Sequence, residues 1–442
     1  MRRPSMTSRR QFNDMQPTEP PDTREALLDA APHAALLPWG ALACLGSANA
    51  AEAVEVLCAS YLLKGLSGAP ARAAVSSGVY AGMLIGGVGG GLLGDAMGRA
   101  RVICLMMVLA FVGGVGAACS GGVAAMACWR VLAGAGVGGA TPPLFALASE
   151  LSDGPARGRG VAFVASHWML GSLFAATLAK ATLPADLTVD FAARDQPWRR
   201  YAFVCALPSL GVAVLFFCKG NLDRGRPVST AEPARFPQSE KRLLAIMGCT
   251  FFGLYFGYYG LSTWIAVLVD SAGIGDAYTV AIYYALATLP GNLIGYLLID
   301  RIGRRRLLAG AMGLSACFGV VLVLTLSIAP EAVRATLAVA AALLVNASTT
   351  AGFAALDALA AESFGSKRKA TAVGLLCAVG RVASICAQVV NASLARSPAR
   401  LVAVTTFLMA LGAASVFFVP ALPQPESVVE TTADDAGGAP LV

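Results

Sequence analysis

Two glutamates, Glu52 and Glu55, stand three positions apart in the apolar stretch SANAAEAVEVLCASYLL, residues 47–63. On a helix this spacing puts both carboxylates on one face. A charge inside a membrane-spanning helix costs roughly 2.5–3.5 kcal/mol on insertion scales, so such residues typically mark functional sites. The pair could bind a proton, attract a cation or form a structural salt bridge, and the residue types alone leave these three readings open.

Arg381 lies near the centre of another apolar stretch, AVGRVASICAQ. A buried guanidinium needs a counter-charge. A carboxylate could supply it, and Glu52, Glu55 and Asp357 are the candidates. An anionic substrate could supply it instead. The acidic pair and the aromatic residues favour an organic cation as ligand, whereas Arg381 leaves an organic anion open.

Other polar and aromatic residues in apolar stretches could act at a site or simply pack. His167 could relay protons, because histidine titrates near neutrality. Asn292 follows Pro290-Gly291, a dipeptide that can break a helix and free backbone carbonyls. Aromatic rings offer a face for a cation and a polar tip. The candidates for walling a cavity are Tyr255, Tyr258, Tyr259, Trp264, Tyr283 and Tyr284.

The composition indicates that these residues lie in membrane helices. The 442 residues are 57% hydrophobic and 13% charged, with 48 glycines. An average soluble domain is about 25% charged. The eleven cysteines are scattered without a CxxC pair, which is typical of small buried side chains. Because neither a nucleophile or metal constellation nor a P-loop is present, we expect a non-enzymatic membrane protein without cofactor or metal.

Dividing the chain at its charged and proline-rich breaks predicts an all-α membrane protein of twelve spans. The predicted spans are 38–62, 73–93, 102–121, 125–148, 159–181, 199–218, 243–269, 278–299, 307–328, 334–360, 371–395 and 399–420. The expected domains are a disordered tail (1–34), a six-helix bundle (35–218), a linker (219–242), a second six-helix bundle (243–420) and a C-terminal tail (421–442).

Basic residues predict the orientation in the membrane. With twelve spans both termini lie on one side, and that side would hold 22 of the Lys and Arg residues against nine on the other. We therefore expect cytoplasmic termini. The net charge of +7 then reflects topology, not nucleic-acid binding.

The two halves carry a repeated loop. GLLGDAMGRAR (91–101) follows the second predicted span, and GYLLIDRIGRRR (295–306) follows the eighth. Both give Asp, then Gly-Arg, at matching positions, and a second pair of charged loops follows the fourth and tenth spans. Two copies in register indicate a duplicated six-helix unit with a conformational role for these loops. The residues concerned are Gly91, Asp95, Gly98, Arg99, Glu150 and Arg157 in the first half and Asp300, Arg301, Gly303, Arg304, Glu362 and Lys369 in the second.

These loops carry a resemblance to the major facilitator superfamily over nearly all of residues 35–420. GLLGDAMGRAR resembles its loop 2–3 motif, with Ala96 in place of the usual Arg. WRVLAGAGVGGATPP (129–143), which contains Arg130, resembles its fourth-span motif, and ELSDGPARG (150–158) resembles the loop that follows. AESFGSKRKATAVG (361–374) resembles the second-half counterpart, with Gly365 for Pro and Lys369 for Arg.

Within the superfamily, the Ala51-to-Glu55 pattern and Arg381 are similar to those of the synaptic-vesicle-protein-like and organic-ion transporters. Sugar porters share the loops, but their glutamine-rich seventh span has no counterpart in FFGLYFGYYGLSTWIAVL.

The resemblance implies a secondary transporter whose two bundles rock about a central site. We expect a small, charged organic solute, an organic cation or a carboxylate, coupled to protons through Glu52 or Glu55. Arg130 and Asp357 are expected to join the gating charges. The alternatives are a sugar or polyol porter and a non-transporting receptor or vesicle scaffold. We expect a monomer in a lipid bilayer, in the plasma membrane in preference to a vesicle membrane.

Overall fold

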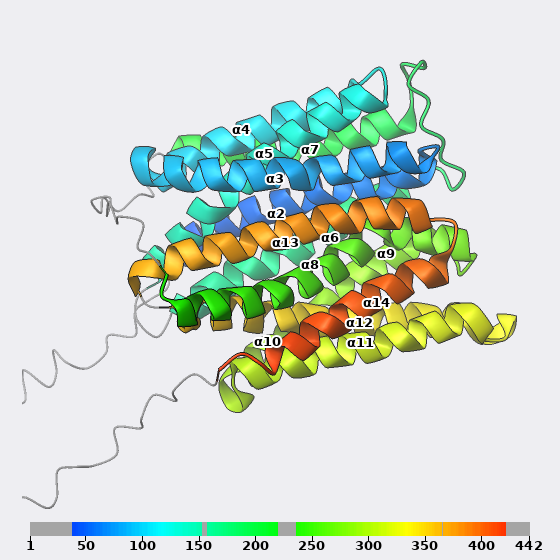
Figure 1. Cartoon of the computed structure of the whole chain (residues 1–442). Coiled ribbons are helices and arrows are strands. Elements are labelled where there is room, and N and C mark those ends of the chain that lie inside the picture. The colour runs from blue at the N-terminus through cyan, green and yellow to red at the C-terminus, as the bar shows by residue number, and fades with distance from the viewer. Residues whose placement is uncertain (1–37, 153–156, 220–235, 365, 421–442) are drawn as a thin grey trace, which may run out of the picture.

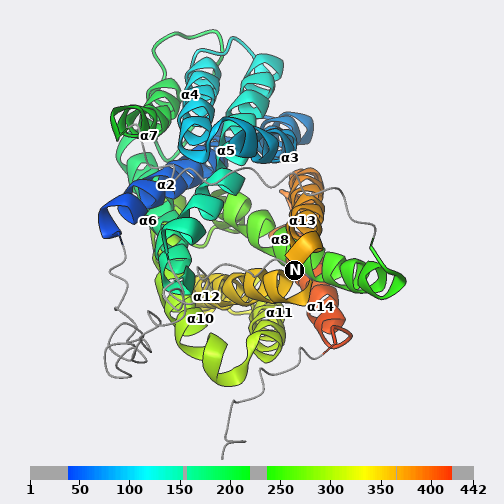
Figure 2. The same ribbon diagram turned by 90° about the vertical axis from the view of Figure 1, so that its left-hand side faces the viewer.

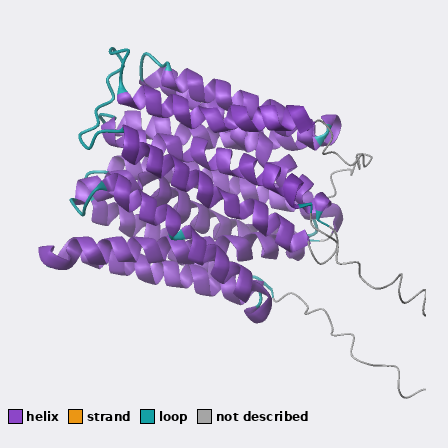
Figure 3. Cartoon of the chain, turned by 180° about the vertical axis from the view of Figure 1, so that it is seen from behind, coloured by secondary structure: helices purple, strands orange, loops and turns teal. Residues whose placement is uncertain are grey.

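The computed structural model describes residues 38–152, 157–219, 236–364 and 366–420. Within these ranges every regular element is a helix, joined by short loops (Figure 3). Twelve spans of helix in the described residues are long and apolar enough to cross a membrane. The expected all-α architecture is confirmed, and the chain is an integral multi-pass membrane protein. The two expected tails, most of the linker and residues 153–156 lie outside the described ranges.

The helices fall into two sets of six spans. The first half contains α2 (Trp39–Leu62), the short η1 (Leu63–Gly65), α3 (Ala69–Met97), α4 (Arg99–Ala118), α5 (Val123–Leu151), α6 (Arg157–Thr182) and α7 (Pro197–Lys219). The second half contains α8 (Gln238–Ala272), α9 (Ala277–Leu286) and α10 (Thr288–Ile302), α11 (Arg304–Ile328), α12 (Glu331–Ser363), α13 (Ser366–Leu394) and α14 (Pro398–Val416). Helices α9 and α10 together form one span.

Several helices run past the predicted spans. The span predicted at 243–269, for example, is a helix over Gln238–Ala272. Spans predicted from the positions of charged residues end at the edge of the hydrocarbon core, whereas the helical hydrogen bonds continue beyond that edge. Charged side chains near a helix end can reach the polar interface, so they do not end the helix.

The same packing scheme occurs in both halves. In the first, α3 and α4 pack on α5, α4 packs on α7, and α2 packs on α6. In the second, α10 and α11 pack on α12, α11 packs on α14, and α8 packs on α13. Each of these packing pairs in the first half thus has an equivalent pair six spans later in the second half. The halves meet mainly through α3 with α13, α6 with α9, and α2 with α8 (Figures 1 and 2).

Glycines bring α3 and α5 into backbone contact. A Cβ atom added to Gly86 would overlap the backbone of Ala135, and one added to Gly90 would overlap that of Gly139. Small residues allow such close approach between membrane helices. The glycine-rich runs at 86–94 and 134–140 therefore form one helix–helix seam within the first half.

The eighth span is interrupted at Ala287, between α9 and α10. Pro290 follows three residues later, and proline cannot donate the backbone hydrogen bond that a helix needs there. The break lies close to the Pro290-Gly291 position that the sequence indicates.

Because the spans alternate in direction, α2 begins and α14 ends on the same face of the bundle, which we call the termini face. Figure 2 looks onto this face. The opposite face, the far face, carries the α2–α3, α6–α7 and α8–α9 connections.

Candidate functional site

An ion pair between α2 and α5 lies in the interior of the first half. Arg130 Nη1 is 3.0 Å from Glu55 Oε2, and Arg130 Nη2 donates a hydrogen bond to the Glu55 backbone carbonyl. The Arg130 and Glu55 side chains are 3% and 1% exposed. Glu55 Oε1 and Arg130 Nε are buried without a hydrogen-bond partner. The pair is thus balanced in charge and incomplete in hydrogen bonding.

Glu52 lies three residues before Glu55 and is equally buried. It accepts a hydrogen bond of 3.2 Å from the Thr141 hydroxyl on α5. No ion pair with Glu52 occurs among the residues that the structure describes. Burying a carboxylate without a paired cation is costly. The position therefore calls for a proton on Glu52 or a positive charge beside it.

Arg381 on α13 is half-buried beside the rings of α8. Its guanidinium carbon lies 5.8 Å from the ring centroid of Tyr255 and 5.5 Å from that of Tyr259. Its Nη1 is buried without a hydrogen-bond partner.

None of the three carboxylates expected as partners, Glu52, Glu55 and Asp357, forms an ion pair with Arg381 in the described structure. Glu55 is paired with Arg130 instead. Asp357 on α12 is exposed and interacts with Arg381 only through longer-range electrostatics. The sequence leaves a carboxylate and an anionic substrate open as the counter-charge of Arg381. In the described structure the guanidinium contacts tyrosine rings and forms no ion pair with a carboxylate.

Both halves contribute to an aromatic cluster around Arg381. Its members are Tyr80, Trp168, Tyr255, Tyr258, Tyr259 and Phe353. The Tyr80 hydroxyl is also 2.7 Å from the Thr263 hydroxyl, which joins α3 to α8 across the interface between the halves. Tyr258 and Tyr259 therefore belong to an aromatic cluster to which both halves contribute, and their role in walling a cavity stays a prediction.

Two aromatic candidates lie elsewhere. Trp264 is fully buried and donates a hydrogen bond of 2.8 Å to Gln388 Oε1 on α13, so it ties two helices of the second half together. Tyr283 is 51% exposed and lines an outer groove with Leu286 and Pro290.

His167 and Asn292 lie outside the cluster. His167 Nδ1 is 2.8 Å from the Phe163 carbonyl of its own helix, and the ring packs against Phe163. Asn292 is half-buried on α10. The amide that reaches the break in the eighth span is Asn346 of α12, which donates a hydrogen bond of 2.5 Å to the Tyr284 carbonyl.

The repeated loops form the same charge cluster in both halves on the termini face. Arg99 lies 2.5 Å from Glu150 Oε1 and 3.8 Å from Asp95 Oδ1. At the matching positions, Arg304 lies 3.1 Å from Glu362 Oε1 and 3.0 Å from Asp300 Oδ1. Each cluster ties the turn between the second and third spans of a half to the end of its fourth span.

Glycines allow the turns on which these arginines stand. Gly98 and Gly303 have φ angles of 95° and 84°, a region that glycine tolerates best. Gly91 lies on α3 near Pro142 of α5. Arg301 and Lys369 are exposed and make no ion pair in the described structure. The Arg157 side chain lies outside the described residues.

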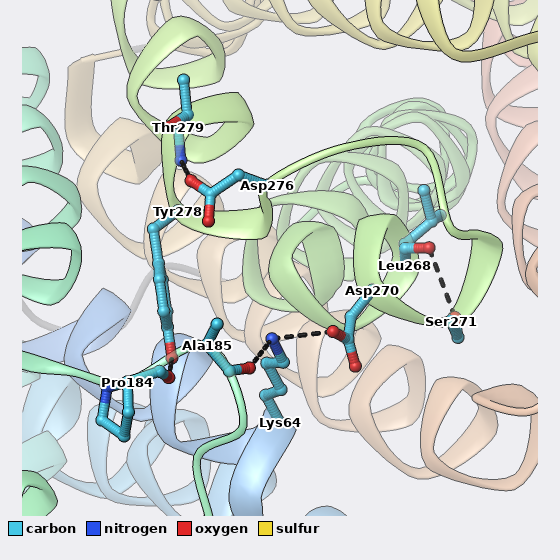
Figure 4. Close-up of polar contacts among 9 residues, drawn as sticks. All are labelled: Lys64, Pro184, Ala185, Leu268, Asp270, Ser271, Asp276, Tyr278 and Thr279. Carbon is cyan, nitrogen blue, oxygen red and sulfur yellow. Dashed lines mark hydrogen bonds and ion pairs between the residues drawn. The ribbon is translucent and has the colours of Figure 1, made fainter.

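On the far face, charged side chains join the two halves directly (Figure 4). Lys64 Nζ of the first half is 2.7 Å from Asp270 Oδ1 of the second, and Lys180 Nζ is 2.9 Å from Asp276 Oδ2. The Tyr278 hydroxyl donates to the Pro184 carbonyl at 3.4 Å. We call these contacts the far-face contacts.

The termini face shows the opposite arrangement. The ion pairs described there stay within one half, namely those of Arg99, of Arg304, and of Arg368 with Glu240. Described ion pairs therefore join the two halves on the far face, whereas none of those described joins them on the termini face.

The fold and the duplicated loops define a two-bundle membrane transporter. The family model of the Major Facilitator Superfamily matches residues 40–387. The chain therefore belongs to the major facilitator superfamily, whose members are transporters and not enzymes.

Curated relatives cover parts of the chain. A probable 4-methylmuconolactone transporter of Cupriavidus pinatubonensis is 27% identical over 67% of this chain and 68% of its own length. The niacin transporter NiaP of Acinetobacter baylyi is 24% identical over 54% of this chain and 60% of its own length. Synaptic vesicle glycoprotein 2C of Mus musculus is 29% identical over 40% of this chain and 25% of its own length. The chain thus spans less than two thirds of the latter two relatives.

Among solved structures, the inward-open xylose transporter XylE of E. coli has a similar fold. The TM-score is 0.67 at 16% identity, over 86% of this chain and 95% of that one. At this identity the likeness concerns the fold alone.

Several residues of the interior and the far face were not singled out in the sequence. Four charged residues stand at span ends on the same predicted side, namely Lys64, Lys180, Asp270 and Asp276. The first half supplies the basic pair and the second half the acidic pair, and this charge pattern could have indicated contacts between the halves. Thr141 and Asn346 gave no comparable signal, because hydroxyl and amide side chains occur throughout the spans.

Proposed function

We propose that the protein is a secondary active transporter that carries a small organic carboxylate through alternating access, coupled to protons. The environment of Arg381 is the observation that supports a carboxylate as the solute. Its guanidinium lies among aromatic rings between the halves, and its Nη1 has no hydrogen-bond partner.

A planar carboxylate matches the chemistry of this position. A guanidinium binds a carboxylate through parallel N–H···O bonds, which neutral ligands cannot match. The tyrosine faces beside it suit a flat ring. Two curated relatives are named for 4-methylmuconolactone and for niacin, and niacin is itself a ring carboxylate.

An organic cation and a sugar are the alternatives. Tyrosine faces and Glu52 could bind a cation, but the unpaired charge of Arg381 would repel it at the same place. A sugar offers no charge to compensate Arg381. The uptake experiment that tests the carboxylate, described below, also tests both alternatives.

The proton-coupling step is proposed for the glutamates of α2. Glu52 has no paired cation, so taking up a proton removes an uncompensated charge. Protonating Glu55 would instead release Arg130 from its ion pair. Either change alters the charge balance of the first half beside the central site, which could link proton binding to the movement of the halves.

For orientation, we infer that the termini face is cytoplasmic, because 22 of the basic residues fall on that side of the sequence and nine on the other. The far face would then be extracytoplasmic, and we place the protein in the plasma membrane.

Uptake into proteoliposomes with an imposed pH gradient tests the proposal. The probes are nicotinate, benzoate, tetraethylammonium and xylose. We expect accumulation of the carboxylates only. Arg381→Gln should lower their uptake by about tenfold or more, because a charged hydrogen bond is lost, and Arg381→Lys should retain part of it. Accumulation of tetraethylammonium or xylose alone would overturn the solute class.

Proton coupling is measured in the same proteoliposomes. Replacing the coupling glutamate by glutamine should abolish gradient-driven accumulation and leave exchange of solute across the membrane intact. If Glu52→Gln and Glu55→Gln both keep full accumulation, the proposed coupling is wrong. Arg200→Gln, which removes an exposed ion pair with Asp195 far from the site, is the control.

A further inference from the structure

We propose that the far-face contacts form an ionic latch that holds the transporter closed on the far face and has to break in every transport cycle. The latch consists of Lys64 and Lys180 from the first half with Asp270 and Asp276 from the second. This inference needs neither the proposed solute nor the proposed proton coupling.

Lys64 is the centre of the first contact. Its Nζ is bound by Asp270 at 2.7 Å, donates to the Ala185 carbonyl at 2.5 Å, and lies 5.5 Å from the ring centroid of Tyr278 (Figure 4). Its side chain is only 10% exposed, whereas that of Asp270 is 48% exposed. Lys64 is thus fixed on its own half through Ala185, and it presents its charge to the other half.

Asp276 organises the second contact. It accepts hydrogen bonds from Lys180 at 2.9 Å and from the Thr279 backbone amide at 2.7 Å, so it also caps the start of α9. Its burial raises the pKa of the carboxyl, but the hydrogen bonds from Thr279 and Lys180 outweigh burial and lower the pKa to about 2. Asp276 therefore keeps its charge at any physiological pH.

Aromatic contacts lie beneath the charges. Tyr278, two residues after Asp276, donates to the Pro184 carbonyl, and its ring lies 6.3 Å from that of Tyr61 on α2. These contacts also cross between the halves. The latch therefore closes a packed interface and is not an isolated surface pair.

The ion pairs of the latch are weak enough to break when the far face opens. Both ion pairs are partly exposed, and exposed pairs contribute little because water and salt screen them. Each pair should shift the balance between closed and open far face by only about two- to fivefold. The charges are divided by half, basic on one side and acidic on the other, so separation of the halves breaks every pair together.

Hydrogen–deuterium exchange on the purified full chain in lipid nanodiscs tests the latch without a solute. The variants are Lys64→Gln, Asp270→Asn and their combination. Each single variant should speed backbone exchange in residues 183–187 and 270–280 by about two- to fivefold. The combination should be no faster than the singles, because one contact is lost in each case. High salt should reproduce the effect in the unaltered chain.

The controls separate charge pairing from local packing. Asp270→Asn leaves the Lys64–Ala185 hydrogen bond in place, so faster exchange at 183–187 in that variant reports the cross-half contact. Lys180→Arg should behave as the unaltered chain, and Lys180→Gln should not. Arg200→Gln neutralises an ion pair within the first half and should leave 270–280 unchanged. Unchanged exchange in Lys64→Gln and Asp270→Asn, or additive effects in their combination, would overturn the latch.

Discussion

At the scale of single residues, two glutamates of one helix face have different environments. Glu55 faces Arg130 of α5 and forms an ion pair, whereas Glu52 faces the Thr141 hydroxyl of the same helix. Their positions on α2 differ by less than one turn. The neighbouring helix therefore decides which carboxylate is neutralised by a cation and which one remains without an ion pair.

The Glu55–Arg130 pair leads to a stability prediction. Arg130→Gln should lower the free energy of unfolding by about 3–5 kcal/mol, because it leaves a buried carboxylate without its partner. The Glu55→Gln/Arg130→Gln double variant should lose less than Arg130→Gln alone, since it removes both charges. Thermal unfolding in detergent measures the difference. A double variant that is less stable than Arg130→Gln would contradict a paired role.

At the scale of elements, the seam between α3 and α5 depends on glycine at particular positions. Gly90 faces the backbone of Gly139, so it has no room for a side chain. Its neighbour Gly89 has no atom within 4 Å of an added Cβ. The two glycines are adjacent in sequence and lie on different faces of the helix, which makes them a matched pair for an experiment.

Gly90→Ala should lower the free energy of unfolding by about 1–3 kcal/mol, the usual range for inserting an extra methyl group into a closely packed interface. Gly89→Ala should be neutral or stabilising, because alanine favours a helix over glycine. Thermal unfolding of the two variants side by side is the measurement. Equal effects of the two substitutions on stability would contradict a seam that depends on close approach at Gly90.

At the scale of the whole molecule, each half carries its own clamp on the termini face. Arg99 and Arg304 occupy equivalent positions and bind equivalent glutamates. The clamps lie within the halves, so their ion pairs do not join one half to the other. A rigid-body movement of two bundles would leave such pairs intact.

The symmetry predicts matching effects of matching substitutions. Arg99→Gln and Arg304→Gln should each slow transport about two- to fivefold, and each should change the free energy of unfolding by no more than about 1 kcal/mol, because these pairs are partly exposed. Arg301→Gln, in the same turn as Arg304 but without an ion pair in the described structure, is the control. Initial uptake rates provide the measurement, and slowing by only one of the two variants would contradict equivalent roles.

Much of this molecule could be read from its sequence by itself. Apolar stretches long enough to cross a bilayer predict twelve spans, and the repeat of Asp95, Gly98 and Arg99 at Asp300, Gly303 and Arg304 predicts two equivalent halves. Both signals are local, because hydrophobic length and turn chemistry act over a few neighbouring residues. Tyr258 and Tyr259 could be named as candidates for the same reason, as rings inside a span, and their role stays a prediction.

Only the tertiary structure decided which charges meet. Glu55 and Arg130 are 75 residues apart, and the candidates for Arg381 included three carboxylates of equal merit in the sequence. The far-face contacts likewise join span ends of opposite halves. Such pairings depend on the rotation of each helix about its axis and on the relative position of the two halves. Neither of these produces a periodic pattern in the sequence. The sequence determined which charged residues stand within the spans, and the packing of helices determined which of them are buried and paired.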